Sequence, residues 1–244
     1  MNVDDTPAFL GQQLAYYRAR AAEYDQWWLR QGRYDRGPVL NARWFAEAEE
    51  ISSALLTRGP FGRVLELACG TGIWTGQLLP FASELTAMDG SPEMIAINAA
   101  RVGSTKIRYI EADLFQWHPT EQFDTVFFSF WLSHVPPARF EAFWELVQSC
   151  LAPGGRVFFL DSRHEPTSTA LDHRLPGADA TVLSRRLNDG REYQIVKVFY
   201  DPIRLTDRMV GLGWSFEISQ TERYFIVGAG GRSGESANRK ADPG

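Results

Sequence analysis

The sequence predicts an α/β fold in which helices cover a mostly parallel sheet. Two observations carry this prediction. An apolar strand pattern over residues 64–67 runs into a glycine turn at Gly70 and Gly72 and then into a helix pattern. From there, strand and helix patterns alternate regularly as far as residue 161. Strands that alternate with helices form parallel sheets with right-handed crossovers.

The turn after the first strand is expected to be a ligand site. Gly70 and Gly72 let the backbone adopt positive φ and let a ligand approach without meeting a Cβ atom. A helix pattern over residues 73–79 follows, and the free N–H groups of a first helical turn attract a carboxylate or a phosphate. The turn alone leaves the identity of the ligand open.

The other core elements follow in order. Further strands are expected at residues 84–88, 107–111, 124–130 and 156–161, and helices at residues 91–101 and 137–151. Pro153, Gly154 and Gly155 signal the end of the second of these helices. Residues 114–122 contain a proline and are few for a full helix, so we expect a loop or a single turn there.

The N-terminal region has the pattern of a helical cap. Apolar residues recur at three- and four-residue spacing between residues 8 and 31, as Leu10, Leu14, Tyr17, Ala21, Tyr24 and Trp28. A second aromatic set lies beside this stripe and consists of Tyr16, Trp27 and Tyr34. So much aromatic surface favours a lid over the ligand, but packing against the core explains the periodicity equally well. Another helix is expected over residues 39–56.

After residue 161 the alternation breaks. Residues 181–187 and 192–200 are β-rich, and the Asn-Asp-Gly sequence between them signals a hairpin. A helix over residues 202–212 and strands over 216–219 and 224–227 complete the pattern. The sequence thus divides into a helical cap at residues 1–58, an α/β domain at 59–228 with an insertion at 161–200, and a tail at 229–244. The tail is rich in glycine, serine and charge, and is expected to be disordered.

Composition and charge argue against several classes of function. The 244 residues are 44% hydrophobic, which suits one main core. The formal net charge of −5 gives no general attraction to nucleic acid or to an anionic membrane. No apolar run reaches the ~18 residues of a membrane span and the N-terminus lacks a signal-peptide pattern, so the expected location is the cytoplasm. Cys69 and Cys150 provide neither a disulfide framework nor a metal spacing, and no metal is expected.

Two cofactors compete for the glycine turn. Gly70, Gly72 and Gly76 have the GxGxxxG spacing that a nicotinamide dinucleotide can use, and Asp89 closes the next strand where a ribose-binding acid is expected. The same layout resembles motif I of the class I S-adenosylmethionine-dependent methyltransferases. Glu66 favours the methyltransferase interpretation, because that family places an acid here that faces the methionine end of the cofactor. A dinucleotide site usually stays apolar at this position.

The resemblance to class I methyltransferases extends over residues 63–227. It rests on ELACGTG at residues 66–72, MDGSPEMI at 88–95, EADLF at 111–115, FDTVFFSFWLSHVPP at 123–137 and LAPGGRVFFLD at 151–161. The order and spacing of these segments carry the resemblance, since each segment alone is weak. It implies a Rossmann-like fold with a mostly parallel seven-stranded sheet, a C-terminal antiparallel strand, the helical N-terminal cap and a β-hairpin insertion after the fifth strand. The implied cofactor is S-adenosyl-L-methionine.

The resemblance also implies roles for individual residues. Asp89 would bind both ribose hydroxyls, because a carboxylate offers two acceptor oxygens at about the spacing of a vicinal diol. Asp113 and the Leu114 backbone would meet the adenine, with Met94 packed on its ring. Ser129 and Phe130 would lie near the sulfonium. The remaining expected cofactor contacts are Glu66, Ala68, Gly70, Thr71, Gly72, Gly90 and Tyr16, and the expected walls of the acceptor pocket are Tyr17, Trp28 and Trp131.

Several of these residues have structural alternatives. Asp89 is also placed to cap the helix that starts near Ser91. Asp113 has the position of an ordinary turn acid. Glu66 is also consistent with a buried acid that binds only protein groups. Trp131 is as well explained by core packing as by an acceptor pocket.

The expected function is transfer of a methyl group from S-adenosylmethionine to oxygen, nitrogen or carbon of a small-molecule acceptor. The alternatives are a non-catalytic S-adenosylmethionine-binding module and an NAD-dependent oxidoreductase. Tyr193 and Lys197 form the YxxxK pair that short-chain dehydrogenases carry on a helix, but their neighbours are β-branched and aromatic and predict a strand. Nucleic acid is not an expected partner, because residues 135–138 lack the polar and aromatic positions of amino-directed nucleic-acid methyltransferases. The oligomeric state stays open, a homodimer included.

His134 is the candidate catalytic residue. It follows the fourth strand, in the loop where class I methyltransferases bring the acceptor near the methyl group, after Phe130 and Trp131. A neutral imidazole there can take a proton from a phenol, hydroxyl or protonated amine, since its unperturbed pKa of about 6.5 lies near working pH. The alternative is that His134 caps the strand end or hydrogen-bonds the turn at Pro136 and Pro137.

Overall fold

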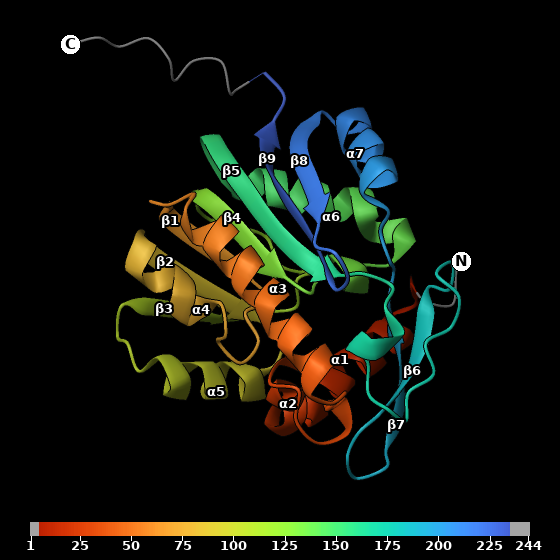
Figure 1. The fold of residues 1–244 in the computed structure, drawn as a ribbon. Helices are drawn as coiled ribbons and strands as arrows, with labels where there is room; N and C mark the ends of the chain where they lie inside the picture. Colours follow the sequence, from red (N-terminus) through yellow and green to blue (C-terminus); the bar gives the residue numbers. More distant parts are fainter. Residues whose placement is uncertain (1–4, 235–244) are drawn as a thin grey trace, which may run out of the picture.

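The computed structural model describes residues 5–234, and a seven-stranded sheet forms its centre (Figure 1). The strand order is β3-β2-β1-β4-β5-β9-β8. The strands are β1 (Gly62–Leu67), β2 (Ala82–Asp89), β3 (Ile107–Glu111), β4 (Phe123–Ser129), β5 (Leu151–Ser162), β8 (Trp214–Gln220) and β9 (Phe225–Arg232). The first five pair in parallel, whereas β9 is antiparallel to both β5 and β8. The predicted fold class is confirmed.

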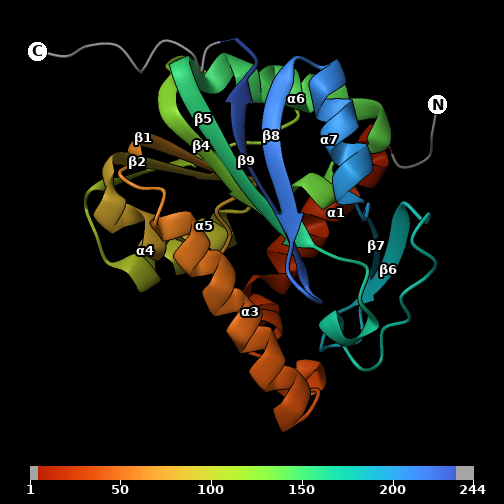
Figure 2. The ribbon, with the colours of Figure 1, turned by 45° about the horizontal axis from the view of Figure 1, so that its top comes forward.

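Helices cover both faces of this sheet (Figure 2). One face carries α3 (Pro38–Leu56), α4 (Thr75–Leu78) and α5 (Pro92–Val102), and the other carries α6 (Phe140–Cys150) and α7 (Pro202–Gly211). Successive side chains of a strand point to opposite faces. Phe127 of β4 accordingly packs with Trp44 of α3, and Phe128 packs with Trp144 of α6. This is why β4 contains a continuous apolar run, residues 126–128, instead of alternating there.

β5 begins five residues earlier than the sequence predicts. α6 does end just before the Pro-Gly-Gly sequence, but Leu151 already pairs with Phe123 of β4. The next pair in the ladder is Arg156 with Thr125, so the residues between bulge out of the sheet. The Pro-Gly-Gly sequence therefore lies inside a strand, where it forms the bulge.

β9 continues through residues that were expected to be disordered. A Cβ atom at Gly228 would lie 2.2 Å from the ring of Phe159, and one at Gly230 would lie 2.1 Å from the carbonyl oxygen of Ser215. These glycines are required because neighbouring groups approach the strand closely, which composition alone does not distinguish from a flexible tail. The prediction of disorder from residue 229 is wrong as far as Arg232, and residues 235–244 of that tail lie outside the described residues.

The predicted N-terminal helix is divided into α1 (Pro7–Arg20) and the short α2 (Tyr24–Trp28), with a 3₁₀ turn between them. The hydroxyl of Thr6 caps α1 by accepting a hydrogen bond from the backbone N–H of Phe9. Beside α1 lies a separate antiparallel hairpin, β6 (Val182–Arg186) and β7 (Glu192–Val196), which confirms the predicted hairpin (Figure 1).

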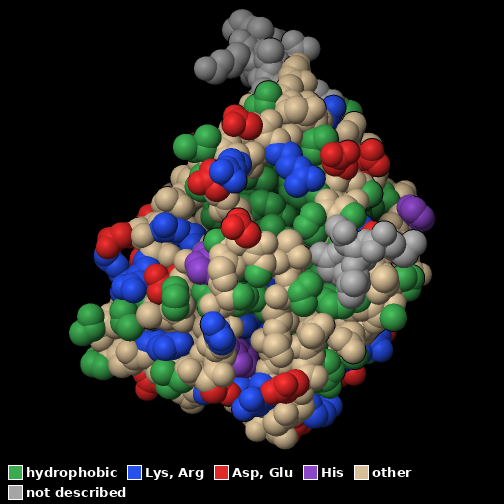
Figure 3. Space-filling model, turned by 90° about the vertical axis from the view of Figure 1, so that its right-hand side faces the viewer, with side chains coloured by type: hydrophobic (Ala, Val, Ile, Leu, Met, Phe, Trp, Pro, Cys, Tyr) green, Lys and Arg blue, Asp and Glu red, His purple; other side chains and the backbone are tan. Residues whose placement is uncertain are grey.

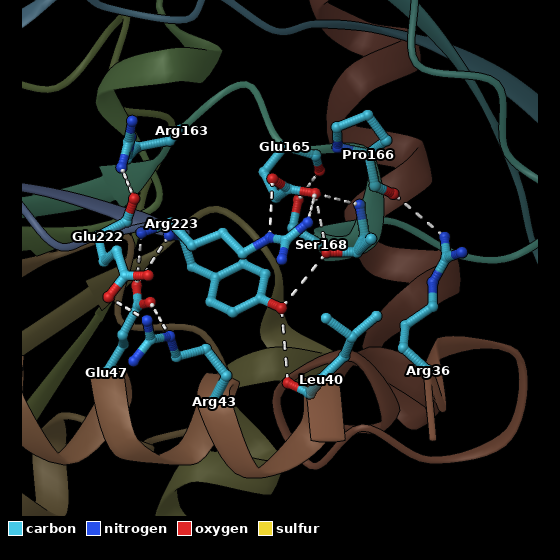
Figure 4. Close-up of polar contacts among 12 residues, drawn as sticks. Arg36, Leu40, Arg43, Glu47, Arg163, Glu165, Pro166, Ser168, Glu222 and Arg223 are labelled. Carbon is cyan, nitrogen blue, oxygen red and sulfur yellow. Dashed lines mark hydrogen bonds and ion pairs between the residues drawn. The ribbon is translucent and has the colours of Figure 1, made fainter. Parts of the chain in front are cut away.

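A polar network fixes α3 to the segment after β5 and to the turn between β8 and β9 (Figure 4). The buried carboxylate of Glu47 accepts a hydrogen bond of 2.8 Å from the backbone N–H of Tyr224. Arg223 forms an ion pair of 3.0 Å with Glu165, and Arg36 donates to the carbonyl of Pro166. These contacts join α3 and the residues before it to the sheet, and the division into a cap at 1–58 and a core stays a prediction.

Candidate active site

A cavity of about 500 Å³ lies between α1 and the ends of β1, β2 and β4. It brings together most of the residues that the sequence singles out for the cofactor and the acceptor. Those that line it are Ala68, Gly70, Asp89, Gly90, Met94, Asp113, Leu114, Ser129, Phe130, Trp131, His134 and Tyr17. Leu10, Leu14 and Tyr17 of the predicted apolar stripe form its α1 wall, and Tyr24 also contributes.

Two strained residues border this cavity at the ends of neighbouring parallel strands. Ala68 follows β1 and Phe130 follows β4, and both have φ of 52°. Positive φ is unfavourable for side chains with a Cβ atom, and such outliers concentrate at ligand sites. Gly70 and Gly72 also have positive φ, as the predicted turn requires. The helix after the turn is shorter than predicted and begins only at Thr75.

Asn98 of α5 braces the turn and is absent from the sequence-based list. Its Nδ2 donates to Thr75 Oγ1 at 2.8 Å and to the Gly70 carbonyl at 3.3 Å, and its Oδ1 accepts from the Tyr109 hydroxyl at 2.9 Å. A Cβ atom at Gly72 would lie 2.6 Å from Asn98 Oδ1. Gly72 does not line the main cavity, so packing against Asn98 explains this glycine better than direct ligand contact. The sequence signal that points to this role is the polar side chain of Asn98 within the apolar pattern of α5.

The carboxylate of Asp89 lies against the glycine turn. Its Oδ2 accepts from the Gly70 N–H and its Oδ1 from the Ser91 N–H, each at 2.9 Å. The N-cap of α5 is Ser91, whose hydroxyl accepts from the Met94 N–H, so the alternative of Asp89 as the helix cap does not hold. Burial raises the pKa of Asp89 to about 6. Each carboxylate oxygen can accept a second hydrogen bond, which leaves both available to a ribose.

Glu66 lies beneath the turn and is only 1% exposed. Thr75 Oγ1 donates to its Oε2 at 2.6 Å, whereas Oε1 has no hydrogen-bond partner within residues 5–234. Burial raises the pKa of Glu66 to about 8, so the carboxyl group is protonated at neutral pH. Glu66 does not line the main cavity, and its contact with the methionine end of a cofactor stays a prediction.

Asp113 and its neighbours form the other end of the cavity. Asp113 Oδ1 accepts from the Phe115 N–H at 2.9 Å, and its Oδ2 accepts from Gln116 Nε2 at 2.8 Å. Asp113 is thus a turn acid and also lines the cavity, so both interpretations of it agree with the structure. Leu114 and Met94 are buried and add the apolar surface that an adenine ring needs.

His134 connects the cavity to α1 and to the hairpin. Its Nδ1 lies 2.6 Å from the carbonyl oxygen of Val196, which can only accept, so Nδ1 carries the proton. Nε2 therefore accepts a hydrogen bond from the Tyr17 hydroxyl, 2.7 Å away. Burial, assisted by the nearby charge of Lys197, lowers the pKa of His134 well below 6.5. The expectation of an unperturbed pKa is wrong, and the basic nitrogen is directed at Tyr17.

Tyr16 does not face the cavity. Successive residues of an α-helix are separated by about 100°, so Tyr16 and Tyr17 point in different directions from α1. Tyr16 is fully buried beneath the hairpin, where it packs with Leu183, Leu187 and Ile195. Its expected role as a cofactor contact is not supported by this position.

Two further predicted residues lie beside the main cavity without lining it. Trp28 packs against Trp44 and Trp74, with ring centroids 5.8 Å away in each case, and so belongs to the core. Thr71 donates to Asp25 at 2.6 Å and borders a small adjoining space of about 20 Å³. The cap therefore combines both expected roles, since one side of it walls the cavity and the other packs against the core.

A second cavity of about 60 Å³ adjoins the first and shares Tyr17, Tyr24, Phe130 and His134 with it. Arg20, Arg185 and Lys197 line this smaller cavity. Sequence reasoning missed all three, because they lie far apart along the chain and belong to no local motif.

Within residues 5–234, no group of three His, Cys, Asp or Glu side chains is placed to hold a metal ion, and no helix has the length and apolar character of a membrane span. Cys69 and Cys150 are buried free thiols. On the face turned toward the viewer in Figure 3, acidic and basic side chains are interspersed. The absence of a nucleic-acid partner, the oligomeric state and the cytoplasmic location stay predictions.

Comparison with known proteins identifies the family. A family model described as a methyltransferase domain matches residues 64–155. Among solved structures, the DhpI–SAH complex aligns with 38% sequence identity over 94% of this chain and 99% of that chain, with a TM-score of 0.77. This chain belongs to the class I S-adenosylmethionine-dependent methyltransferases.

Other members of this family are more distant or match in part. The trans-aconitate 2-methyltransferase of Escherichia coli is 34% identical over 140 residues, which is 54% of each chain. This chain thus matches about half the length of that curated relative. The N-methyltransferase NodS from Bradyrhizobium japonicum, in complex with S-adenosylhomocysteine, shares 16% identity over 91% of this chain and 98% of its own, with a TM-score of 0.60. At that identity the likeness shows the fold alone.

Proposed function

We propose that this protein transfers the methyl group of S-adenosylmethionine to an oxygen, nitrogen or carbon atom of a small-molecule acceptor. The observation that carries the proposal is the continuity of the main cavity. It joins Asp89 and Asp113, the expected nucleoside contacts, to Tyr17, Trp131 and His134 on the acceptor side. Its volume of about 500 Å³ suits a small-molecule site. A module that only binds the cofactor does not require this second set of residues.

The residues present fit the cofactor. Asp89 offers two carboxylate oxygens to a ribose diol, and Glu66 holds a buried oxygen without a partner among the described residues. A Cβ atom added at Gly70 would meet nothing within 4 Å, so the turn leaves open space where a ligand would approach. S-adenosylmethionine brings a methyl group that is already activated. The protein therefore needs mainly to align the acceptor and exclude water.

The oxidoreductase alternative lacks its catalytic pair. Tyr193 lies within β7, and Lys197 directly follows that strand, so the two do not share a helix face. Lys197 Nζ is instead 3.2 Å from Asp161 Oδ1. The prediction of a strand is confirmed for residues 192–196, and the strand ends before Lys197.

Tyr17 and His134 provide a path for a proton at the acceptor side. The Tyr17 hydroxyl donates to His134, which leaves the lone pairs of its oxygen free to accept from a bound hydroxyl or ammonium group. A proton that leaves the acceptor can pass to Tyr17 while the Tyr17 proton passes to His134. The role of His134 as a base thus stays part of this proposal, with Tyr17 as its intermediary. Acceptor atoms that carry no proton do not need this path.

The proposal is tested by acceptor-dependent formation of S-adenosylhomocysteine. A panel of phenols, amines, carboxylic acids and phosphonates is incubated with S-adenosylmethionine and the protein, and Asp89→Ala serves as the background. Calorimetry with S-adenosylmethionine, S-adenosylhomocysteine and NAD identifies the cofactor independently. Binding of S-adenosylmethionine without turnover of any acceptor above the background would favour the non-catalytic module. Binding of NAD alone would favour the oxidoreductase.

A further inference from the structure

The smaller cavity beside the acceptor side is lined by three basic side chains. Arg20 comes from the end of α1, Arg185 from β6, and Lys197 from the residue after β7. Arg20 and Lys197 are only 9% and 6% exposed. These two side chains are therefore interior and not part of a basic outer surface.

The positive charges of these three side chains outnumber the negative charges beside them. Asp161 lies 3.2 Å from Lys197 and compensates one charge. Among the described residues that line the cavity there is no aspartate or glutamate. Elsewhere the chain does pair its arginines: Arg33 lies 3.7 Å from Glu23 and 3.2 Å from Asp172. Two guanidinium groups in the small cavity thus lack the partner that a purely structural role would supply.

The hydrogen-bond donors of these groups are also incompletely used. Arg20 stacks on Tyr24, with its guanidinium carbon 4.8 Å from the ring centroid, and makes one long hydrogen bond of 3.4 Å to Tyr34. Its Nε and the Nη1 of Arg185 are buried and have no partner within residues 5–234. Burial lowers the pKa of both Arg185 and Lys197, whereas the tyrosines around Arg20 raise its pKa despite its burial. Water can satisfy such donors but cannot compensate their charge, whereas an oxyanion does both.

We infer that this cavity is the part of the acceptor site that binds an oxyanion head group, a carboxylate or a phosphoryl group, through Arg20, Arg185 and Lys197. The inference rests on the proposed function and adds the charge of the acceptor to it. A volume of about 60 Å³ suits a head group and is too small for a whole acceptor. The rest of the molecule extends past Tyr17 and His134, which belong to both cavities.

The inference is tested first by direct binding. Inorganic phosphate and malonate are titrated by calorimetry into protein saturated with S-adenosylhomocysteine. The anion that binds more tightly indicates whether the head group is a phosphoryl group or a carboxylate. Arg185→Gln should weaken this binding by about 10- to 100-fold, the range for losing a hydrogen bond to a charged group. Arg191→Gln is the matched control: it lies on the same hairpin, its side chain is 56% exposed, and affinity should stay within about twofold.

Failure of either anion to bind at millimolar concentration, or equal affinity in wild type and Arg185→Gln, would overturn the inference. An unchanged affinity for S-adenosylhomocysteine shows that each variant is folded. Arg20→Gln provides a second variant, with the same expected loss.

The second test separates this inference from the proposed function. Phosphate or malonate should compete with the acceptor and not with S-adenosylmethionine, and Arg185→Gln should raise the acceptor KM about tenfold or more. If an acceptor that carries a carboxylate or phosphoryl group turns over with the same KM in wild type and in Arg185→Gln, methyl transfer stands and the oxyanion site is wrong. If the anions bind as expected but no acceptor is methylated, the anion site stands and the proposed function fails.

Discussion

The two ends of the active-site cavity are built in opposite ways. At the nucleoside end, contacts are local: Gly70 and Asp89, which hydrogen-bond each other, are 19 positions apart. At the acceptor end, contacts join residues that are far apart in the sequence: Tyr17 and His134 are 117 positions apart, and His134 and Val196 are 62 positions apart. A local unit of strand, turn and helix therefore fixes the first end, whereas the second exists only when α1, the β4 loop and the hairpin have assembled.

The two ends also differ in charge. The nucleoside end holds two buried acids, with the pKa of Asp89 raised to about 6 and that of Glu66 to about 8. The acceptor end holds buried cations, and burial lowers the pKa of Lys197 there. At neutral pH Glu66 is therefore uncharged and Asp89 carries the negative charge of the nucleoside end, whereas the acceptor end is cationic and suited to an anionic head group. Substitutions at one end should therefore leave ligand binding at the other largely intact.

The largest effect is expected from Gly70→Val. Gly70 has φ of 52°, which a β-branched residue tolerates poorly, and its side chain would project into open space in the protein. We expect a folded protein that has lost S-adenosylhomocysteine binding in calorimetry but retains phosphate binding at the acceptor end. Cofactor affinity near that of wild type in a folded variant would show that this turn is not the nucleoside site.

Substitution of His134 should give the next largest effect. His134→Ala is expected to lower kcat by about 10²- to 10⁴-fold for an acceptor that must lose a proton, with cofactor affinity within a few-fold. Since Nε2 is hydrogen-bonded to the Tyr17 hydroxyl, Tyr17→Phe should lower kcat in the same range. The double variant should add little further loss, because the two residues act in series. Normal turnover by Tyr17→Phe across neutral pH would leave His134 with a structural role.

Asp89→Ala should have a smaller effect on ligand binding at the nucleoside end. The substitution removes both acceptors for a ribose diol and the hydrogen bond to the Gly70 N–H. Affinity for S-adenosylhomocysteine should fall by about 1.5 to 3 kcal/mol, the range for hydrogen bonds to a charged group. Malonate or phosphate affinity should not change. An unaltered cofactor affinity in calorimetry would contradict the assignment of Asp89 to the ribose.

A smaller effect is expected from Glu66 as the pH changes. Burial raises the pKa of Glu66 from 4.5 to about 8, so the folded chain binds this proton more tightly than the unfolded chain does. The contribution of Glu66 to stability is therefore full below pH 4.5 and is lost as the pH rises toward 8. The Tm of ligand-free Glu66→Gln, relative to wild type, should be higher at pH 8 than at pH 5. A constant difference in Tm between these pH values would show that Glu66 does not titrate in this window.

The sequence predicts the nucleoside end well for a physical reason. Ile107–Glu111 is a strand with the predicted bounds, and Asp89 lies beside Gly70 because β1 and β2 are paired neighbours. Residues that depend on long-range packing were missed. Arg185 reaches the small cavity only because the hairpin packs against α1, and the glycines of β9 resemble a flexible tail until the ring of Phe159 is in place.

The smallest effect is expected at Tyr16, which the sequence assigns to the cofactor. Tyr16 is buried between α1 and the hairpin, outside the main cavity, and its hydroxyl is buried without a hydrogen-bond partner among the described residues. Tyr16→Phe removes only that hydroxyl, so the free energy of unfolding should stay the same or rise by up to ~1 kcal/mol. S-adenosylhomocysteine affinity should remain within about twofold of wild type. Tyr17→Phe, one position along the same helix, is the matched comparison, because Tyr17 lines the cavity and donates to His134. If Tyr16→Phe instead weakens cofactor binding as much as Asp89→Ala does, α1 must rotate when the cofactor binds, and the two ends of the cavity are not independent.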